Sequence, residues 1–143
     1  MEKARDDNLV VSILSTDMSK ALDSLHLPLL LSKYKAYGFQ ERLIQLLNSY
    51  LWDRYNRVKL GNEVSSYRLV YRGCSQSSAL GPLPWNIFQT DLPLGVATDI
   101  SMYADDDQLY HSGHNQQKVA PKLDASANQA TRWFKSSLLL REP

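Results

Sequence analysis

The sequence predicts a domain of the mixed α+β class. Two segments, residues 28–52 and 116–134, have apolar residues at helical spacing, and they alternate with runs of β-branched and aromatic residues that favour strands. The 143 residues are enough for one domain of ordinary size, and contents of 43% hydrophobic and 22% charged residues are close to globular averages. A wholly disordered chain is therefore excluded.

The segment Leu9 to Thr16 is mostly apolar and rich in β-branched residues, a pattern typical of a strand buried on both faces. Asp17 follows it directly, and a carboxylate at the end of a core strand is costly unless it reaches solvent or a cation. Asp23 lies six residues further on. We expect it to cap a helix, with metal binding as the less favoured alternative.

Two helices are predicted next. Pro28 suits the first turn of a helix that runs to Gly38, because its missing N–H has no partner there. A second helix is expected from Gln40 to about Trp52. Its apolar stripe would consist of Leu43, Ile44, Leu46 and Leu47.

Residues 54–73 have the alternation of a β-hairpin with Gly61-Asn62 as its connection. The densest basic cluster of the chain lies on both arms. Such residues either protect strand edges from aggregation or contact the phosphates of nucleic acid, and the sequence leaves both readings open. The cluster consists of Arg54, Arg57, Lys59, Arg68 and Arg72, of which the four arginines are the candidate nucleic-acid-binding residues.

Three further elements complete the prediction. A helix can form over Leu80 to Phe88, although Pro82 and Pro84 make its first turn awkward. Asp91 to Gly95 has the composition of a turn. The amphipathic segment 116–134 contains Pro121, so its helix is expected to begin near that residue.

Between these helices lies Tyr103-Ala104-Asp105-Asp106-Asp107, three consecutive carboxylates flanked by short segments that favour strands. We expect a tight hairpin with acids at its tip. Because adjacent carboxylates repel one another, the fold must leave them in water, raise the pKa of one of them or supply a cation. Alone, the five residues fit a solvated turn better than a metal site. Hard oxygen ligands of this kind nevertheless suit magnesium.

Several classes of protein are excluded. Cys74 is the one cysteine, so the chain has no internal disulfide, and the three histidines do not have metal-ligand spacing with it. No run of about 18 apolar residues is present, and no apolar leader follows a basic start. We therefore expect an intracellular protein, cytoplasmic or nuclear, without membrane contact.

Three blocks of motifs follow one another in a fixed order along the chain. The segment from Asp17 to Asp23 is similar to D-x-x-K-A-F-D, and Tyr103 to Asp106 is the Y-A-D-D block. The central block, P-Q-G-S-x-L-G-P-x-x-(F/W)-N-I-x-x-x-D-L-P, is matched from Ser75 to Pro93. In this order the three blocks resemble those of a known family, the reverse transcriptases of non-LTR, LINE-type retrotransposons, and the resemblance extends from about Leu9 to Leu140.

This resemblance implies a polymerase palm, an antiparallel sheet backed by helices, that copies an RNA or DNA template from a primer with deoxynucleoside triphosphates. It implies two magnesium ions, or manganese in their place. Asp17, Asp105 and Asp106 would be the catalytic metal ligands. Leu22 would face the substrate sugar, where the family has Phe or Tyr, and Gln76 and Ser78 would lie beside the new base pair.

The chain also departs from the family pattern. Serines 75 and 77 replace the proline and glycine of P-Q-G-S, Pro84 replaces a leucine, and Asp107 stands where threonine is usual. We expect a frayed segment at residues 1–8, a partial reverse transcriptase domain at 9–140 with fingers and thumb largely missing, and a tail at 141–143. The alternative function is a catalytically inactive, palm-like remnant that binds nucleic acid weakly.

Overall fold

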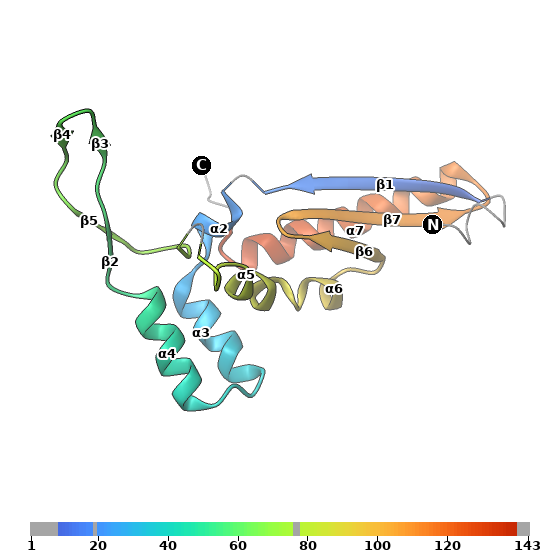
Figure 1. Cartoon of the computed structure of the whole chain (residues 1–143). Helices are drawn as coiled ribbons and strands as arrows, with labels where there is room; N and C mark the ends of the chain where they lie inside the picture. The colour runs from blue at the N-terminus through green and yellow to red at the C-terminus, as the bar shows by residue number, and fades with distance from the viewer. Residues whose placement is uncertain (1–8, 19, 76–77, 140–143) are drawn as a thin grey trace. The chain divides into compact units, whose positions relative to one another are not determined.

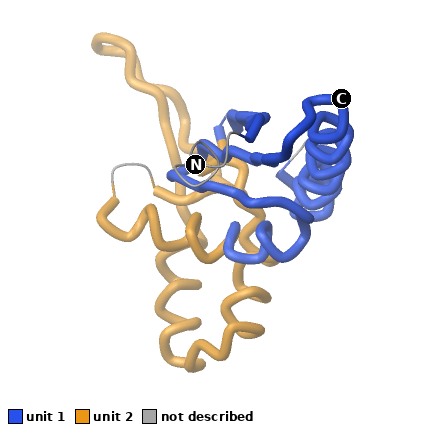
Figure 2. Tube along the Cα trace, turned by 90° about the vertical axis from the view of Figure 1, so that its right-hand side faces the viewer, with its two compact units in different colours: residues 1–20, 89–143 blue, residues 21–88 orange. Residues whose placement is uncertain are grey.

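The computed structural model describes residues 9–18, 20–75 and 78–139. The chain divides into two compact units, unit 1 with residues 1–20 and 89–143 and unit 2 with residues 21–88 (Figure 2). The predicted frayed segment 1–8 and the tail 141–143 lie outside the described residues.

Unit 1 is built on an antiparallel sheet in the order β1-β7-β6 (Figure 1). The strands are β1 (Val10–Asp17), β6 (Asp99–Tyr103) and β7 (Asp106–Gly113). The helix α7 (Gln116–Ser136) packs against β1 and β7, and the one-turn helix α6 (Leu92–Gly95) contacts α7. The prediction of a mixed α+β fold is confirmed.

The covered face of the sheet is the one that carries Leu109, which is fully buried. Leu14 of β1 and Ile100 of β6 are its register partners and lie on the same face. His111 Nε2 lies 3.2 Å from the hydroxyl of Ser126 on α7. Since alternate residues of a strand point to opposite faces, this register also determines which residues stay on the open face.

The strand β1 is not buried on both faces, contrary to the prediction from its composition. It is an edge strand that pairs with β7 alone, and Ile13 in its middle is 47% exposed. β-Branched residues favour strands whether one face or both faces are buried, so the composition of β1 does not distinguish the two cases. The predicted place of Asp17, at the end of this strand, is confirmed.

The helix α7 begins at Gln116 and not near Pro121, so that prediction is wrong. The side chain of Asn115 accepts a hydrogen bond from the N–H of Gln117 at 2.8 Å and caps the first turn. Proline inside a helix removes one backbone hydrogen bond. Val119, buried before Pro121, gives the first turn an apolar anchor.

Unit 2 contains α2 (Ala21–Ser24), α3 (Leu27–Ala36) and α4 (Glu41–Leu51), with most of α5 (Pro82–Gln89). Both predicted helices from 28 to 52 are confirmed. Of the predicted stripe on α4, Ile44 and Leu47 are buried, whereas Leu43 and Leu46 are 41% and 62% exposed. The helix packs on α3 through part of that stripe.

Asp23 does not cap a helix from outside, as the sequence suggested, because it lies within α2. The N-cap of α3 is His26, whose Nδ1 accepts a hydrogen bond from the N–H of Leu29 at 3.3 Å. Histidine is a rare cap, so composition gave no signal for it. Burial, followed by the charge of Arg72, lowers the pKa of His26, which favours the neutral ring that this cap requires.

The helix α5 is confirmed in spite of its two prolines. Pro82 is the first residue of the helix and Pro84 the third, and the first turn of a helix has no intrahelical partner for its N–H groups. Both prolines therefore cost no hydrogen bond. The ammonium of Lys33 on α3 donates to the carbonyl of Phe88 at 2.5 Å.

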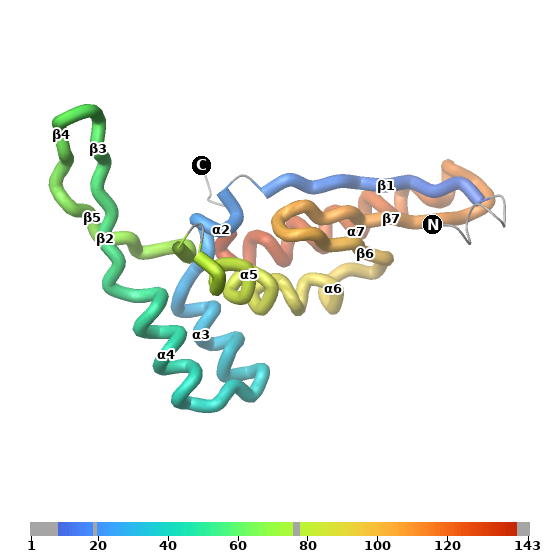
Figure 3. Tube along the Cα trace, in the orientation of Figure 1, coloured from blue at the N-terminus to red at the C-terminus, as the bar shows by residue number. Residues whose placement is uncertain are grey.

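The predicted hairpin is present as two short ladders along one pair of arms (Figure 3). The strand β2 (Arg54–Asn56) pairs with β5 (Arg68–Val70), and β3 (Lys59–Leu60) pairs with β4 (Glu63–Val64). Leu60 lies opposite Glu63, so Gly61-Asn62 is the two-residue connection that the sequence predicted. Gly61 has a φ of +59°, which explains glycine at this place.

Candidate functional site

The acidic segment forms the turn between β6 and β7. Tyr103 lies opposite Asp106 in the register, which leaves Ala104 and Asp105 as the two turn residues. Ala104 has a φ of 53°, and Asp105 is not among the residues with positive φ. A positive φ at the first of two turn residues is the pattern of a type II′ turn, where glycine is the usual residue. The predicted tight hairpin with acids at its tip is confirmed.

Asp17 and Asp106 are brought face to face. They are the last register pair of β1 and β7, and both side chains are exposed on the open face of the sheet. Opposite residues of an antiparallel pair have Cβ atoms about 5 Å apart. Like charges in such a pair destabilise it. Asp105, half-buried in the turn, lies next in the chain.

Asp107 points to the opposite face of the sheet. It is 1% exposed, and neither of its carboxylate oxygens has a hydrogen-bond partner among the described residues. Burial, with the charges of Asp105 and Asp106, raises the pKa of Asp107 to about 6. The turn thus separates its three acids into two exposed or half-exposed carboxylates and one that is partly protonated near neutral pH.

Magnesium suits the exposed pair. Magnesium is usually bound through one or two protein carboxylates, while water and substrate phosphates fill its other positions. Asp17 and Asp106 supply two such carboxylates, and Asp105 a third nearby. In the described part of the chain, no group of three or more His, Cys, Asp or Glu side chains is arranged as a ready metal cage. The geometry fits a magnesium site in which the carboxylates supply some of the ligands and a bound substrate supplies the others.

The other residues predicted to contact substrate lie in unit 2. Leu22 is in α2, and its carbonyl accepts a hydrogen bond from the N–H of Cys74 at 3.1 Å. The hydroxyl of Ser78 lies 3.3 Å from the N–H of Leu80, which donates to it within a local turn. Gln76 lies outside the described residues.

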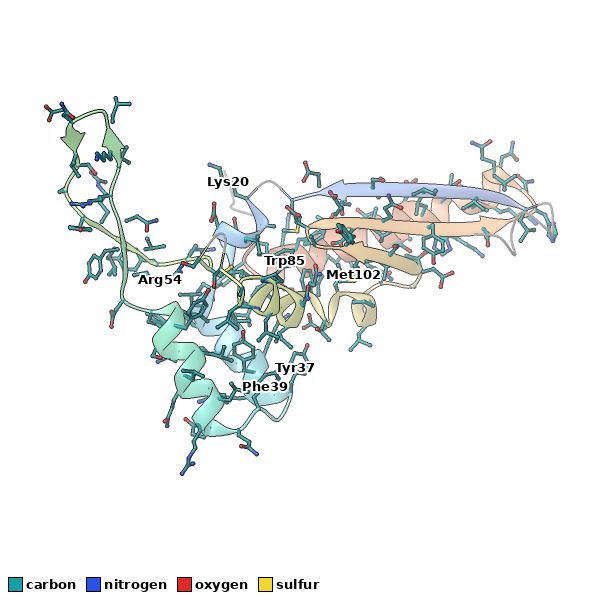
Figure 4. The ribbon with its side chains drawn as sticks, in the orientation of Figure 1. Lys20, Tyr37, Phe39, Arg54, Trp85 and Met102 are labelled. Carbon is teal, nitrogen blue, oxygen red and sulfur yellow. The ribbon has the colours of Figure 1, made fainter. Side chains whose placement is uncertain are left out.

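Arg54 has a structural role that the sequence did not suggest. Its Nε donates to the carbonyl of Leu51 at 2.8 Å, and its Nη2 donates to the carbonyls of Arg72 and Gly73. It joins the end of α4 to the return arm of the hairpin (Figure 4). Arg72 in turn donates to the carbonyl of Ser24 at 3.3 Å. Nucleic-acid binding by either arginine stays a prediction.

Arg57 and Arg68 lie further out on the hairpin and are exposed. The guanidinium of Arg57 lies over the ring of Tyr67, 4.9 Å from its centroid. The same hairpin carries Tyr55, Tyr67 and Tyr71, which are all exposed and which the prediction of a nucleic-acid contact did not include. The even spacing of Tyr67 and Tyr71, which puts them on one face of a strand, was the available signal.

No helix among the described residues is long and apolar enough to cross a membrane.

The family model for "Reverse transcriptase (RNA-dependent DNA polymerase)" matches residues 2–139. The chain is 31% identical to a probable RNA-directed DNA polymerase from transposon BS of Drosophila melanogaster, over 99% of its own length. It is 25% identical, over 57% of its length, to a retrovirus-related Pol polyprotein from the type-1 retrotransposable element R2 of Popillia japonica. The chain spans 16% and 13% of these two relatives.

Proposed function

The chain belongs to the reverse transcriptase (RNA-dependent DNA polymerase) family, with relatives in non-LTR retrotransposons, and from that premise we propose that it is part of a polymerase palm. In this proposal, unit 1 carries the metal-binding half of a site for template-directed nucleotidyl transfer. The single observation that carries the proposal is the register pair of Asp17 and Asp106 beside the turn of Asp105.

The argument rests on charge. Two carboxylates directly opposite each other on neighbouring strands destabilise the pair unless something offsets their repulsion. Both side chains are exposed to solvent. A divalent cation bound by these carboxylates would offset their mutual repulsion. The residues that would hold it are Asp17, Asp105 and Asp106.

The chemistry that two bound divalent cations would supply is activation of a primer 3′-hydroxyl and stabilisation of the leaving pyrophosphate. The chain's own residues position this chemistry. The ladder between β1 and β7 holds Asp17 and Asp106 at a fixed separation, because their backbones are hydrogen-bonded neighbours. Ala104, with a φ of 53°, and Asp105 form the turn, so that Asp105 directly precedes Asp106 at the start of β7. Leu22, Gln76 and Ser78 remain the proposed contacts for the nucleotide.

Primer extension on an RNA template, with deoxynucleoside triphosphates and with or without magnesium, tests the proposal. The chain spans a small part of its relatives, so a readout that does not require polymerase activity is needed as well. Electron paramagnetic resonance therefore monitors the binding of manganese to the chain. We expect Asp106→Asn and Asp17→Asn to remove magnesium-dependent extension and to weaken manganese binding at least tenfold, because each removes one of two opposing ligands.

Asp99→Asn is the matched control. Asp99 is exposed on the same open face, and its substitution removes the same charge. It lies four residues from Tyr103, about 14 Å along β6, and therefore far from the proposed ligands. It should bind manganese like the parent chain. Extension or metal affinity that survives Asp105→Ala together with Asp106→Asn would refute the proposed site.

A second candidate function is nucleic-acid binding without nucleotidyl transfer. The observation that favours it is the basic hairpin of unit 2, with Arg57 and Arg68 exposed. The expected sign is an affinity for oligonucleotides that falls steeply with salt while extension stays absent with either metal. An affinity that is independent of salt would contradict this candidate.

A further inference from the structure

The basic hairpin differs in charge from the rest of the chain. Residues 54–72 contain five basic residues and one acid, Glu63, for a net charge of +4. The other residues contain 11 basic and 14 acidic residues, for a net charge of −3. The near-neutral total of +1 therefore hides a separated positive segment, which is the charge pattern of a surface that binds a polyanion.

Three of the eight tyrosines of the chain also lie in this segment, and all are exposed. The exposed fractions are 56% for Tyr55, 62% for Tyr67 and 71% for Tyr71. Large aromatic side chains that face water at this density are unusual unless they bind something. Edge protection, the bland reading of the basic residues, needs no aromatic side chains.

The pairing of β2 with β5 puts the tyrosines on one side. Tyr55 lies opposite Leu69, whereas Arg54 and Asn56 lie opposite Val70 and Arg68. Because side chains alternate, the face of Tyr55 and Leu69 continues to Tyr67 and Tyr71 on the return arm.

Arg57 also belongs to this face. Its guanidinium lies over the ring of Tyr67, which places the two side chains on the same side of the hairpin. We call this set, Tyr55, Arg57, Tyr67 and Tyr71, the tyrosine face.

We propose that the tyrosine face binds single-stranded nucleic acid, with bases stacked on its tyrosines and phosphates held by Arg57 and Lys59. Stacking on aromatic side chains between basic residues is how proteins grip single strands without reading sequence. The inference deepens the proposed function, since it names a contact for template or primer. All the residues concerned lie in unit 2, and the inference needs no metal and no catalysis.

A single strand fits the face better than a duplex does. The bases of a duplex are stacked on one another, so their flat faces are closed to tyrosine rings, and only the phosphates remain for the basic residues. A protein partner would use the same exposed rings but would gain little from a segment of net charge +4 beside each ring. The combination of charge and exposed rings favours the single strand.

Fluorescence anisotropy of the full chain with a labelled 12-nucleotide single-stranded RNA, in EDTA, tests the proposal. We expect Tyr55→Ala and Tyr71→Ala each to weaken binding by roughly 5-fold to 100-fold, the loss of one stacked base. The Phe variants at these positions should bind like the parent, because they keep the ring. With two phosphate contacts, the logarithm of the binding constant plotted against the logarithm of the salt concentration should have a slope of about −1.4.

Matched controls come from the same unit. Leu46→Ala removes a side chain that is 62% exposed on α4, and Arg42→Ala removes an exposed charge on the same helix. Both should bind RNA like the parent chain. A duplex of the same sequence should bind more weakly, and Tyr71→Ala should not change its affinity.

Two results would overturn the inference. The first is parental affinity for the single strand in both tyrosine-to-alanine variants, whose folding is checked by circular dichroism. The second is an equal loss for single strand and duplex, which would reduce the face to a phosphate contact. Because the assay contains no metal, loss of the proposed catalytic site would leave its outcome unchanged, and the two failures are distinguishable.

Discussion

The acidic hairpin and the basic hairpin are built alike and packed differently. Each has a two-residue connection, Ala104-Asp105 in the acidic hairpin and Gly61-Asn62 in the basic one. The acidic hairpin is packed, since β7 lies between two strands and under α7. Among the residues that the structure describes, the arms of the basic hairpin pair with each other and with no other strand, and Leu60 near the tip is 81% exposed.

This difference shows how packing fixes the position of a candidate site side chain. Burial of Leu109 on one face holds β7 in register with β1, and the register sets Asp106 opposite Asp17 on the other face. The basic hairpin has no such support on either face of its tip. Its side chains are therefore available to a ligand but are not held at fixed separations.

The largest expected contrast is in core packing. Leu109→Ala should lower the free energy of unfolding by about 2–5 kcal/mol, because it leaves a cavity under α7. Leu60→Ala should change it by less than about 0.5 kcal/mol, since the side chain is already in water. Urea denaturation followed by far-UV circular dichroism measures both. Equal losses in the two variants would show that the basic hairpin is packed as well.

The second prediction concerns the buried acid of the packed hairpin. A folded-state pKa of about 6 for Asp107, above its ordinary 3.8, means that the folded chain holds the proton more tightly than the unfolded chain. The contribution of this group to the free energy of unfolding is fully present below pH 3.8 and is lost as the pH rises towards and through 6. Asp107→Asn should therefore stabilise the chain at pH 7 by about 3 kcal/mol, two units of pKa.

Urea denaturation at pH 4 and pH 7, in EDTA, measures this effect. The gain from Asp107→Asn should be close to zero at pH 4, where the parent carboxyl is already protonated in the folded state. Asp124→Asn on the exposed side of α7 is the control and should show no such pH dependence. A gain of equal size at both pH values would contradict the explanation from ionisation.

The smallest expected effects on stability come from substitutions in the two turns, and the two substitutions have opposite signs. Ala104→Gly should stabilise the acidic hairpin by about 1 kcal/mol, because glycine accepts the positive φ of 53°. Gly61→Ala should destabilise the basic hairpin by about 1 kcal/mol, because alanine must adopt a φ of +59° there. Amide hydrogen exchange of the flanking strands measures each effect locally.

Gly61→Ala introduces no steric clash, since no atom of the described residues lies within 4 Å of a Cβ placed on Gly61. The same sign in both variants would argue against the turn geometry. Gly73 is a useful contrast, because a Cβ there would lie 2.7 Å from the Cα of Asp23 and would clash with backbone.

Much of the fold followed from the sequence where local chemistry decides. The alternation around Gly61-Asn62 and around the three acids predicted both hairpins, and Pro28 predicted the start of α3. The failures had long-range causes. The prediction for Pro121 counted a lost hydrogen bond and missed the burial of Val119, and that for β1 missed that it lies at an edge.

The candidate site divides in the same way. The sequence by itself determined that Asp105 and Asp106 follow one another at a tight turn, and that Asp106 and Asp107 point to opposite faces, because a strand alternates. Only the tertiary structure decided which face is covered and that Asp17 lies opposite Asp106. Those facts depend on where α7 and β1 pack, across more than 80 residues of intervening chain, and no local preference specifies them.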